Sequence, residues 1–121
     1  MQLWFNTDLQ PIDAMEADAL LRDDLARRIT HTALTTDKGR VEVSTIFLVL
    51  NHAFMAGVPP LLWETMVFGG PDDMAQRRYS SREAALVGHA ETVTYVKVAL
   101  ELEGTTVIAE ETFEGATRAE Q

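Results

Sequence analysis

The stretch from Val41 to Gly70 constrains the fold most, because it holds two apolar runs joined by a short connector. The runs are Val41–Leu50 and Leu61–Phe68, and a Gly-Gly-Pro break ends the second. Both are rich in β-branched and aromatic residues, and both are too short and too uniformly apolar for an amphipathic helix. The connector Asn51–Pro60 is too short for a helical crossover. We therefore expect two largely buried, antiparallel neighbouring strands.

Glu64 places a single carboxylate inside the second run. A buried, ionised and unpaired carboxylate is costly, so the side chain needs a hydrogen-bonding partner or a proton. A guanidinium can satisfy a carboxylate with two bonds. The sequence therefore predicts an ion pair between Glu64 and either Arg77 or Arg78.

Further strands are expected on either side of these two. Arg28–Thr36 alternates in the manner of a strand, and Asp37-Lys38-Gly39 can form a hairpin turn to Arg40–Leu50, with Gly39 at positive φ. Short strands are expected at Gln2–Asn6 and Thr105–Ala109.

Two helices are predicted from capping patterns. Asp13, with Glu16 three residues later, indicates a helix over about 13–27, and Ser80 with Glu83 indicates another that extends to about Glu103. The β-branched segment 91–103 fits a helix or a strand, and the pattern leaves both open. The segment 69–79 is expected to be a loop.

The predicted fold class is α+β, with an antiparallel sheet of three to five strands and two helices packed mainly on one face. The length of 121 residues is typical of one domain. We expect a single domain over 1–121, with 110–121 as a frayed polar tail.

The net charge of −9 is concentrated near the two ends of the chain. Residues 1–28 hold six acidic and three basic side chains, and residues 99–121 hold six and one. This charge makes direct nucleic-acid binding an unfavoured function and favours a basic protein surface as partner. The absence of cysteine, of a signal-peptide pattern and of a long apolar span predicts a cytoplasmic protein without membrane contact.

No familiar catalytic motif is present, but one set of side chains could carry chemistry. His52, Glu64 and His89, with His31 near them in the predicted hairpin, could share a proton or bind a divalent metal. Their spacing is not that of a known metal site, and hydrogen bonding within the core explains them equally. If these side chains only form hydrogen bonds within the core, we expect no cofactor. A divalent metal is the alternative.

Two groups are candidate binding residues. Arg77, Arg78 and Tyr79 precede the second helix, where arginines and free backbone N–H groups favour an anion or an acidic peptide. Phe54 and Met55 lie in the connector, where exposed apolar side chains indicate a contact surface. Homodimerisation through the connector or a sheet edge is a further possibility.

Three stretches, STIFLVLNHAF, PPLLWETMVFGGPDD and RRYSSREAALVGH, resemble a group of small proteins encoded by bacteriophages of actinobacteria. The resemblance covers about 40% of the chain, over residues 43–89. It implies a phage origin but no established activity. The recurrent polar positions of the group correspond to Asn51, His52, Glu64, Arg78, Tyr79 and His89. Asn51 stands where the group has an aspartate, which weakens the case for a metal there, although an amide oxygen can still bind a hard ion.

The sequence thus favours a small phage accessory protein that binds a host or phage protein in the cytoplasm of the infected bacterium. One alternative is a metal-assisted hydrolase or other small enzyme that uses His52, Glu64 and His89. Another is an acidic mimic of nucleic-acid charge that binds a DNA-handling protein.

Overall fold

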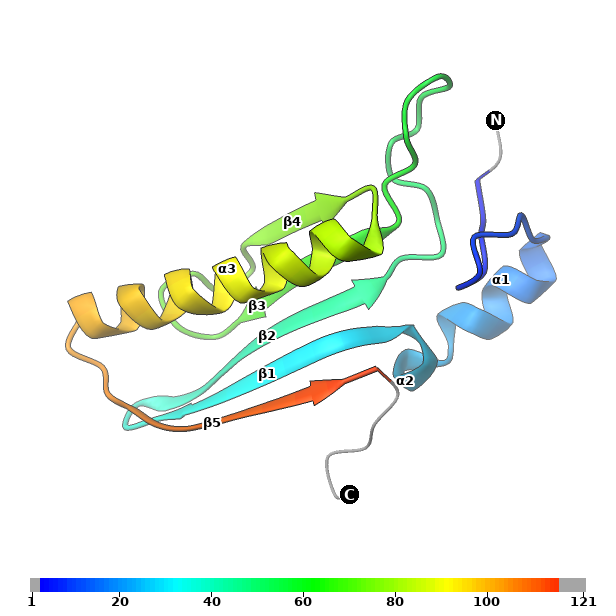
Figure 1. Cartoon of the computed structure of the whole chain (residues 1–121). Helices are drawn as coiled ribbons and strands as arrows, with labels where there is room; N and C mark the ends of the chain where they lie inside the picture. The colour runs from blue at the N-terminus through cyan, green and yellow to red at the C-terminus, as the bar shows by residue number, and fades with distance from the viewer. Residues whose placement is uncertain (1–2, 116–121) are drawn as a thin grey trace.

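The computed structural model describes residues 3–115, which form one antiparallel sheet with a long helix across one face (Figure 1). The five strands lie in the order β4-β3-β2-β1-β5. The fold is therefore α+β, as predicted. The elements are α1 (Ala14–Leu21), α2 (Asp24–Arg27), β1 (Arg28–Thr36), β2 (Gly39–Phe47), β3 (Trp63–Phe68), β4 (Gln76–Tyr79), α3 (Arg82–Leu102) and β5 (Val107–Glu114).

The predicted meander of three strands is confirmed. β1 and β2 form a hairpin with Thr36 opposite Gly39, and Gly39 has a φ of 121°, which a side chain would strain. β3 returns antiparallel to β2, with Phe47 opposite Trp63 and Glu42 opposite Phe68. The two apolar runs of the sequence therefore lie side by side.

The expectation of a continuous loop over 69–79 is wrong, because β4 forms at Gln76–Tyr79. It pairs with β3, with Trp63 opposite Tyr79 and Met66 opposite Gln76. β4 is an edge strand, and polar or charged side chains suit an edge that faces solvent. The charged residues of β4 lack the apolar pattern of a buried strand, so the sequence pattern did not predict this one.

The segment 91–103 is helical, as the C-terminal part of α3. Ser81 caps the helix by accepting a hydrogen bond from Ala84 N, so the helix begins one residue later than the pattern of Ser80 and Glu83 indicated. Val93 and Val96 are buried against the sheet. A helix is needed here because β4 and β5 lie at opposite edges and the chain must cross the whole sheet between them.

The expectation of a frayed tail from residue 110 is wrong up to Glu114, because β5 extends over Val107–Glu114. It pairs with β1, with Thr30 opposite Glu114 and Thr36 opposite Val107. Lys97 of α3 forms an ion pair with Glu110. Backbone pairing at this edge therefore orders a segment whose composition resembles a tail. The end of the predicted tail, 116–121, lies outside the described residues.

The N-terminal predictions are partly correct. Asp13 caps α1 and accepts from Glu16 N at 2.8 Å, as expected. The predicted helix over 13–27 is divided, because Asp23 begins the separate short helix α2 as its N-cap. In place of a strand at the N-terminus, the described residues form isolated bridges between Trp4 and Leu50 and between Phe5 and Pro11.

The core consists of two apolar clusters beneath the helices. The first joins Ala17 of α1 and Ala85 of α3 to Phe47 and Trp63 of the sheet, so both helices pack into it. The second packs the later turns of α3, including Val96, on β1, β2 and β3. Within residues 3–115, no helix is long and apolar enough to cross a membrane.

Candidate functional site

The connector between β2 and β3 forms a closed loop that carries exposed apolar side chains. Buried Asn51 holds the base of the loop, because its Oδ1 accepts hydrogen bonds from Ala53 N at 2.9 Å and Leu61 N at 3.0 Å. An aspartate oxygen could accept the same two bonds. Within the loop, Phe54 is 58% exposed and Met55 is 60% exposed. The prediction that these two side chains face solvent is confirmed.

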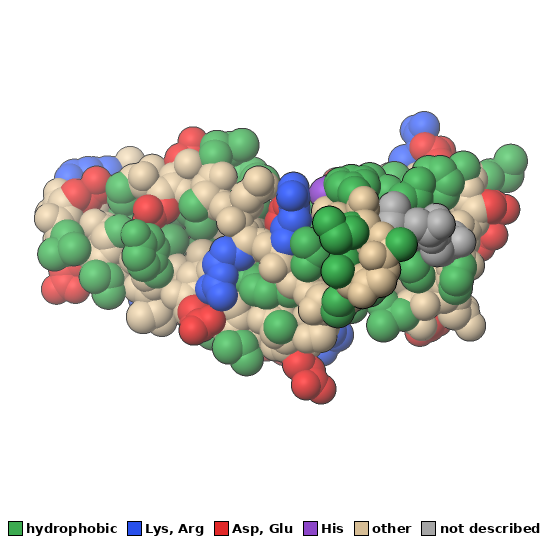
Figure 2. All heavy atoms as spheres, turned by 90° about the horizontal axis from the view of Figure 1, so that it is seen from above, with side chains coloured by type: hydrophobic (Ala, Val, Ile, Leu, Met, Phe, Trp, Pro, Cys, Tyr) green, Lys and Arg blue, Asp and Glu red, His purple; other side chains and the backbone are tan. Residues whose placement is uncertain are grey.

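Phe54 also has an unusual backbone conformation, with φ at 51°. A residue with a side chain at positive φ is strained by about 1 kcal/mol or more, and such residues cluster at functional sites. Val58, at 43% exposed, extends the apolar surface. We call residues 53–60 the contact loop. The connector between β2 and β3 rises above the sheet (Figure 1), and the view from above shows hydrophobic side chains gathered on this side of the molecule (Figure 2).

His52, Glu64 and His89 do not form a common site. The Nδ1 of His52 lies 2.8 Å from Leu50 O at the base of the contact loop. His89 belongs to α3, and its side chain extends to the sheet and contacts Thr45 of β2. Because Thr45 is opposite Thr65, the adjacent Glu64 points to the other face of the sheet. Among residues 3–115, no group of three His, Asp or Glu side chains is arranged to hold a metal ion. The ligand set of the hydrolase alternative is thus not assembled.

Glu64 is 8% exposed, and its partner is Arg78. This confirms one of the two predicted pairings, which were with Arg77 and with Arg78. The Nε of Arg78 donates to Oε2 of Glu64 at 2.9 Å. The pairing follows from the strand register, which places Glu64 opposite Arg78 on β4. Arg78 therefore neutralises a buried carboxylate on the sheet face that points away from α3, rather than standing free as an anion site.

Replacing Arg78 by methionine should reduce the free energy of unfolding by about 1–2 kcal/mol, because Glu64 would lose its charged partner while staying buried. Urea denaturation measures this loss. Arg22→Met is the matched control, since Arg22 pairs with Asp18 in an exposed position, where an ion pair contributes less than about 1 kcal/mol. Equal losses in the two variants would contradict a special role for the pair of Glu64 and Arg78.

His89 is the centre of a row of polar side chains that crosses the sheet beneath α3. Its Nδ1 lies 2.7 Å from Oγ1 of Thr45, and its Nε2 lies 2.9 Å from Oγ1 of Thr32. Oγ1 of Thr45 also lies 2.5 Å from Oγ1 of Thr65, and the Tyr79 hydroxyl donates to Thr65 Oγ1 at 3.0 Å. The row ends on β5, where Thr112 lies 3.0 Å from Thr32. We call these six residues the polar row; every strand contributes one of them.

One arrangement of protons gives each contact from Tyr79 to Thr32 in the polar row one donor and one acceptor. Because the Tyr79 hydroxyl donates, Thr65 can donate to Thr45, and Thr45 can donate to Nδ1 of His89. His89 then donates from Nε2 to Thr32, as a neutral imidazole with its proton on Nε2. Burial, with a smaller contribution from the charge of His31, lowers the pKa of His89 to about 4. The side chain is therefore uncharged at neutral pH.

His31 lies on the opposite face of the sheet, away from the polar row. Its Nε2 is 2.9 Å from Oε1 of Glu42, and this hydrogen bond is the main cause that lowers the pKa of the Glu42 carboxyl. Arg40 adds a second contact to Glu42, at 3.3 Å. These three residues form a surface ion-pair group.

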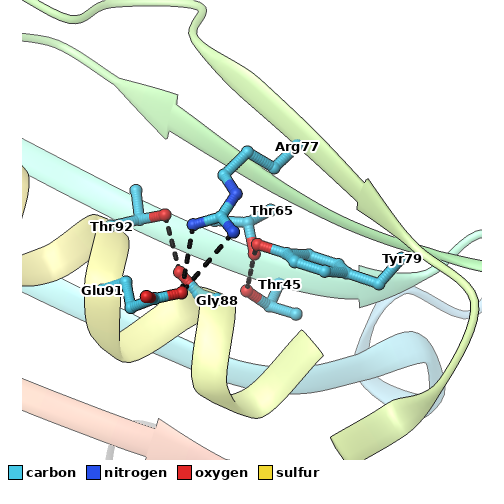
Figure 3. Close-up of polar contacts among 7 residues, drawn as sticks. All are labelled: Thr45, Thr65, Arg77, Tyr79, Gly88, Glu91 and Thr92. Carbon is cyan, nitrogen blue, oxygen red and sulfur yellow. Dashed lines mark hydrogen bonds and ion pairs between the residues drawn. The ribbon is translucent and has the colours of Figure 1, made fainter. Parts of the chain in front are cut away.

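The predicted group of Arg77, Arg78 and Tyr79 is divided between the two faces of the sheet. Tyr79 is 7% exposed and belongs to the core and the polar row, so it is not a surface binding residue. Arg77 extends over α3, where its guanidinium lies 3.5 Å from Glu91 (Figure 3). Arg77 also lies 5.5 Å from the centre of the Tyr79 ring.

A groove of about 350 Å³ lies beside Arg77, between α3 and the β3–β4 hairpin. Thr65, Arg77 and Glu91 approach it from β3, β4 and α3, respectively (Figure 3). Asp72, in the hairpin turn, also lines it. No sequence pattern indicates this groove, because its apolar and polar lining residues come from separate segments and meet only through strand pairing and the crossing of α3.

Comparison with protein-family models finds no match to this chain. The comparisons with curated proteins and with solved structures find no match either.

Proposed function

We propose that this protein acts by binding another protein, with the contact loop as its principal surface. The observation that carries the proposal is the solvent exposure of Phe54 and Met55 on a loop held closed by Asn51. Exposed aromatic and methionine side chains are enriched where proteins meet. A loop that is already ordered loses little conformational entropy on binding.

The positive φ of Phe54 supports the same proposal. The strain would be relieved by glycine, yet an aromatic residue occupies the position and presents its ring to solvent. The adjacent ring of His52 lies 5.6 Å from that of Phe54 and restricts its position. Phe54 is therefore the best candidate for an anchor that inserts into a pocket of the partner.

The nature of the partner is inferred from charge and from sequence resemblance. The net charge of −9 favours a partner with a basic surface. The resemblance to proteins of actinobacterial phages makes a host or phage protein in the bacterial cytoplasm the expected partner. Homodimerisation through the contact loop or through a sheet edge, β4 or β5, stays a prediction, which sedimentation of the purified chain would test.

The double substitution Phe54→Ser with Met55→Ser should abolish capture of the partner from a lysate of an actinobacterial host, while the free energy of unfolding changes by less than about 0.5 kcal/mol. Capture on immobilised protein, followed by mass spectrometry, measures the loss. Met15→Ser is the matched control, because Met15 is 83% exposed but lies on α1. Capture that is equal for the wild type and the double variant would contradict the proposal.

A further inference from the structure

The groove between α3 and the β3–β4 hairpin has the character of a small ligand site. Its volume of about 350 Å³ lies near the lower end of the range that is typical for small-molecule pockets. Apolar side chains form much of its wall, including Val67 of β3, Ala75 before β4 and Val96 of α3. The groove uses none of the residues of the contact loop, so it is independent of the proposed function.

The charged groups that face the groove do not balance. Arg77 and Glu91 lie 3.5 Å apart and largely neutralise each other. Asp72 remains as an additional carboxylate, and its Oδ2 is shielded from solvent without a hydrogen-bond partner within residues 3–115. Buried polar atoms are almost always hydrogen-bonded, and an exception calls for an explanation. Asp72 therefore has no counterion within the described residues, and the charged groups of the groove carry one negative charge in excess.

Asp72 is unpartnered although its surroundings are well connected by hydrogen bonds. Its own carbonyl accepts from Ala75 N, and the neighbouring Asp73 accepts from Gly69 N at 2.7 Å. The turn is therefore closed without any contribution from the Asp72 carboxylate. This side chain is not required to build the hairpin, and because the residue is partly exposed and lines the groove, its carboxylate can take a ligand there.

The geometry points to a small organic ammonium ion as the ligand of this groove, with its charged group on Asp72 and its apolar body against Val67 and Val96. An ammonium group supplies the missing charge and up to three donors. Tyr95, which also lines the groove, offers an aromatic ring to a cation. The acidity of the whole chain favours the approach of a cation.

An anion fits the groove poorly. The cation of the site, Arg77, is already beside Glu91, and an anion would meet the charges of both Glu91 and Asp72. An uncharged ligand could fill the apolar part but would leave the charge of Asp72 unbalanced. A cation, an anion and an uncharged ligand should therefore bind this groove with different affinities, and a binding experiment can distinguish them.

Titration of the isotope-labelled chain with n-hexylammonium chloride, followed by amide NMR, tests the inference. We expect saturable shifts confined to amides of the groove, with an affinity about tenfold or more above those of n-hexanol and of sodium hexanoate. Nα-acetyl-lysine N-methylamide serves as a further probe. If it bound more tightly than hexylammonium, the ligand would be a lysine side chain of a protein, and the assignment to a free amine would be overturned.

Two variants locate the site. Asp72→Asn should weaken hexylammonium binding about tenfold or more without affecting folding, since the Asp72 carboxylate makes no bond in the hairpin. Ala75→Phe should block the groove while leaving its charge unchanged. Glu111→Gln, which removes one charge from the exposed residue 111 of β5, is the control and should bind as the wild type. Unchanged affinity in Asp72→Asn, or equal binding of hexanol and hexylammonium, would overturn the inference.

Discussion

Replacing Gly88 by alanine is expected to destabilise the protein by about 2–4 kcal/mol, although the same change in an ordinary helix stabilises by about 1 kcal/mol. Gly88 lies in α3, directly over the Tyr79 ring. A Cβ at this position would lie 2.2 Å from both Cε1 and the hydroxyl oxygen of Tyr79, which no real structure tolerates. Helix and ring must then separate, and the Tyr79 hydroxyl would lose Thr65. Urea denaturation measures the loss.

A double-mutant cycle identifies the cause of the Gly88 effect. In a Tyr79→Ala background the clash is absent, so adding Gly88→Ala should be neutral or stabilising. The Tyr79→Ala variant is itself less stable, because it leaves a cavity in the first core cluster. If Gly88→Ala were equally damaging with and without the ring, close packing of Tyr79 on α3 could not be the reason.

Lowering the pH from about 7 to about 4.5 is expected to reduce the free energy of unfolding by on the order of 2 kcal/mol because of His89. The folded pKa of His89 is about 4, below the value of about 6.5 for an unfolded chain. The unfolded state therefore binds the proton first as the pH falls. Stability from this residue is complete above about pH 6.5 and declines down to about pH 4. Urea midpoints at a series of pH values measure the decline.

His89→Gln should be less stable at pH 7 and should lose much of this pH dependence, because glutamine does not titrate. His52→Gln is the matched control, because it removes a histidine that lies outside the polar row. Glu42 also contributes, since the lowered pKa of its carboxyl stabilises the fold above about pH 4.5. Measurements above pH 5 separate the two groups. An identical pH dependence in His89→Gln and the wild type would show that His89 is not the buried titrating group.

The polar row explains why both predictions have large effects. Gly88 and His89 are adjacent in α3, and together they allow Tyr79, Thr65 and Thr45 to form a continuous hydrogen-bonded chain beneath the helix. The two apolar clusters of the core share no residue. A row of paired polar groups between strands and helix can specify one register, because any slip would leave several buried donors unsatisfied.

Local sequence signals were sufficient for the central strands. The apolar runs predicted β2 and β3, and the turn at Gly39 predicted the β1–β2 hairpin. The buried position of Glu64 predicted an arginine as its partner. These features depend on side-chain periodicity and on the cost of burying a charge, which are properties of short segments. The same holds for the exposure of Phe54 and Met55 beside glycine and prolines.

The edge strands and the polar sites required the tertiary structure. The start of β5 falls within the strand predicted at Thr105–Ala109, but β4 and the later part of β5 are largely polar and become strands because β3 and β1 offer them unpaired backbone groups. His89 and Glu64 appeared to be possible partners in the sequence, but strand alternation places them on opposite faces of the sheet. Asp72 and Arg77 face one groove only because α3 crosses the sheet above the β3–β4 hairpin. The amino-acid sequence alone thus determined which segments are buried, whereas contacts between distant segments decided which polar groups meet, because hydrogen bonds depend on positions that no local pattern specifies.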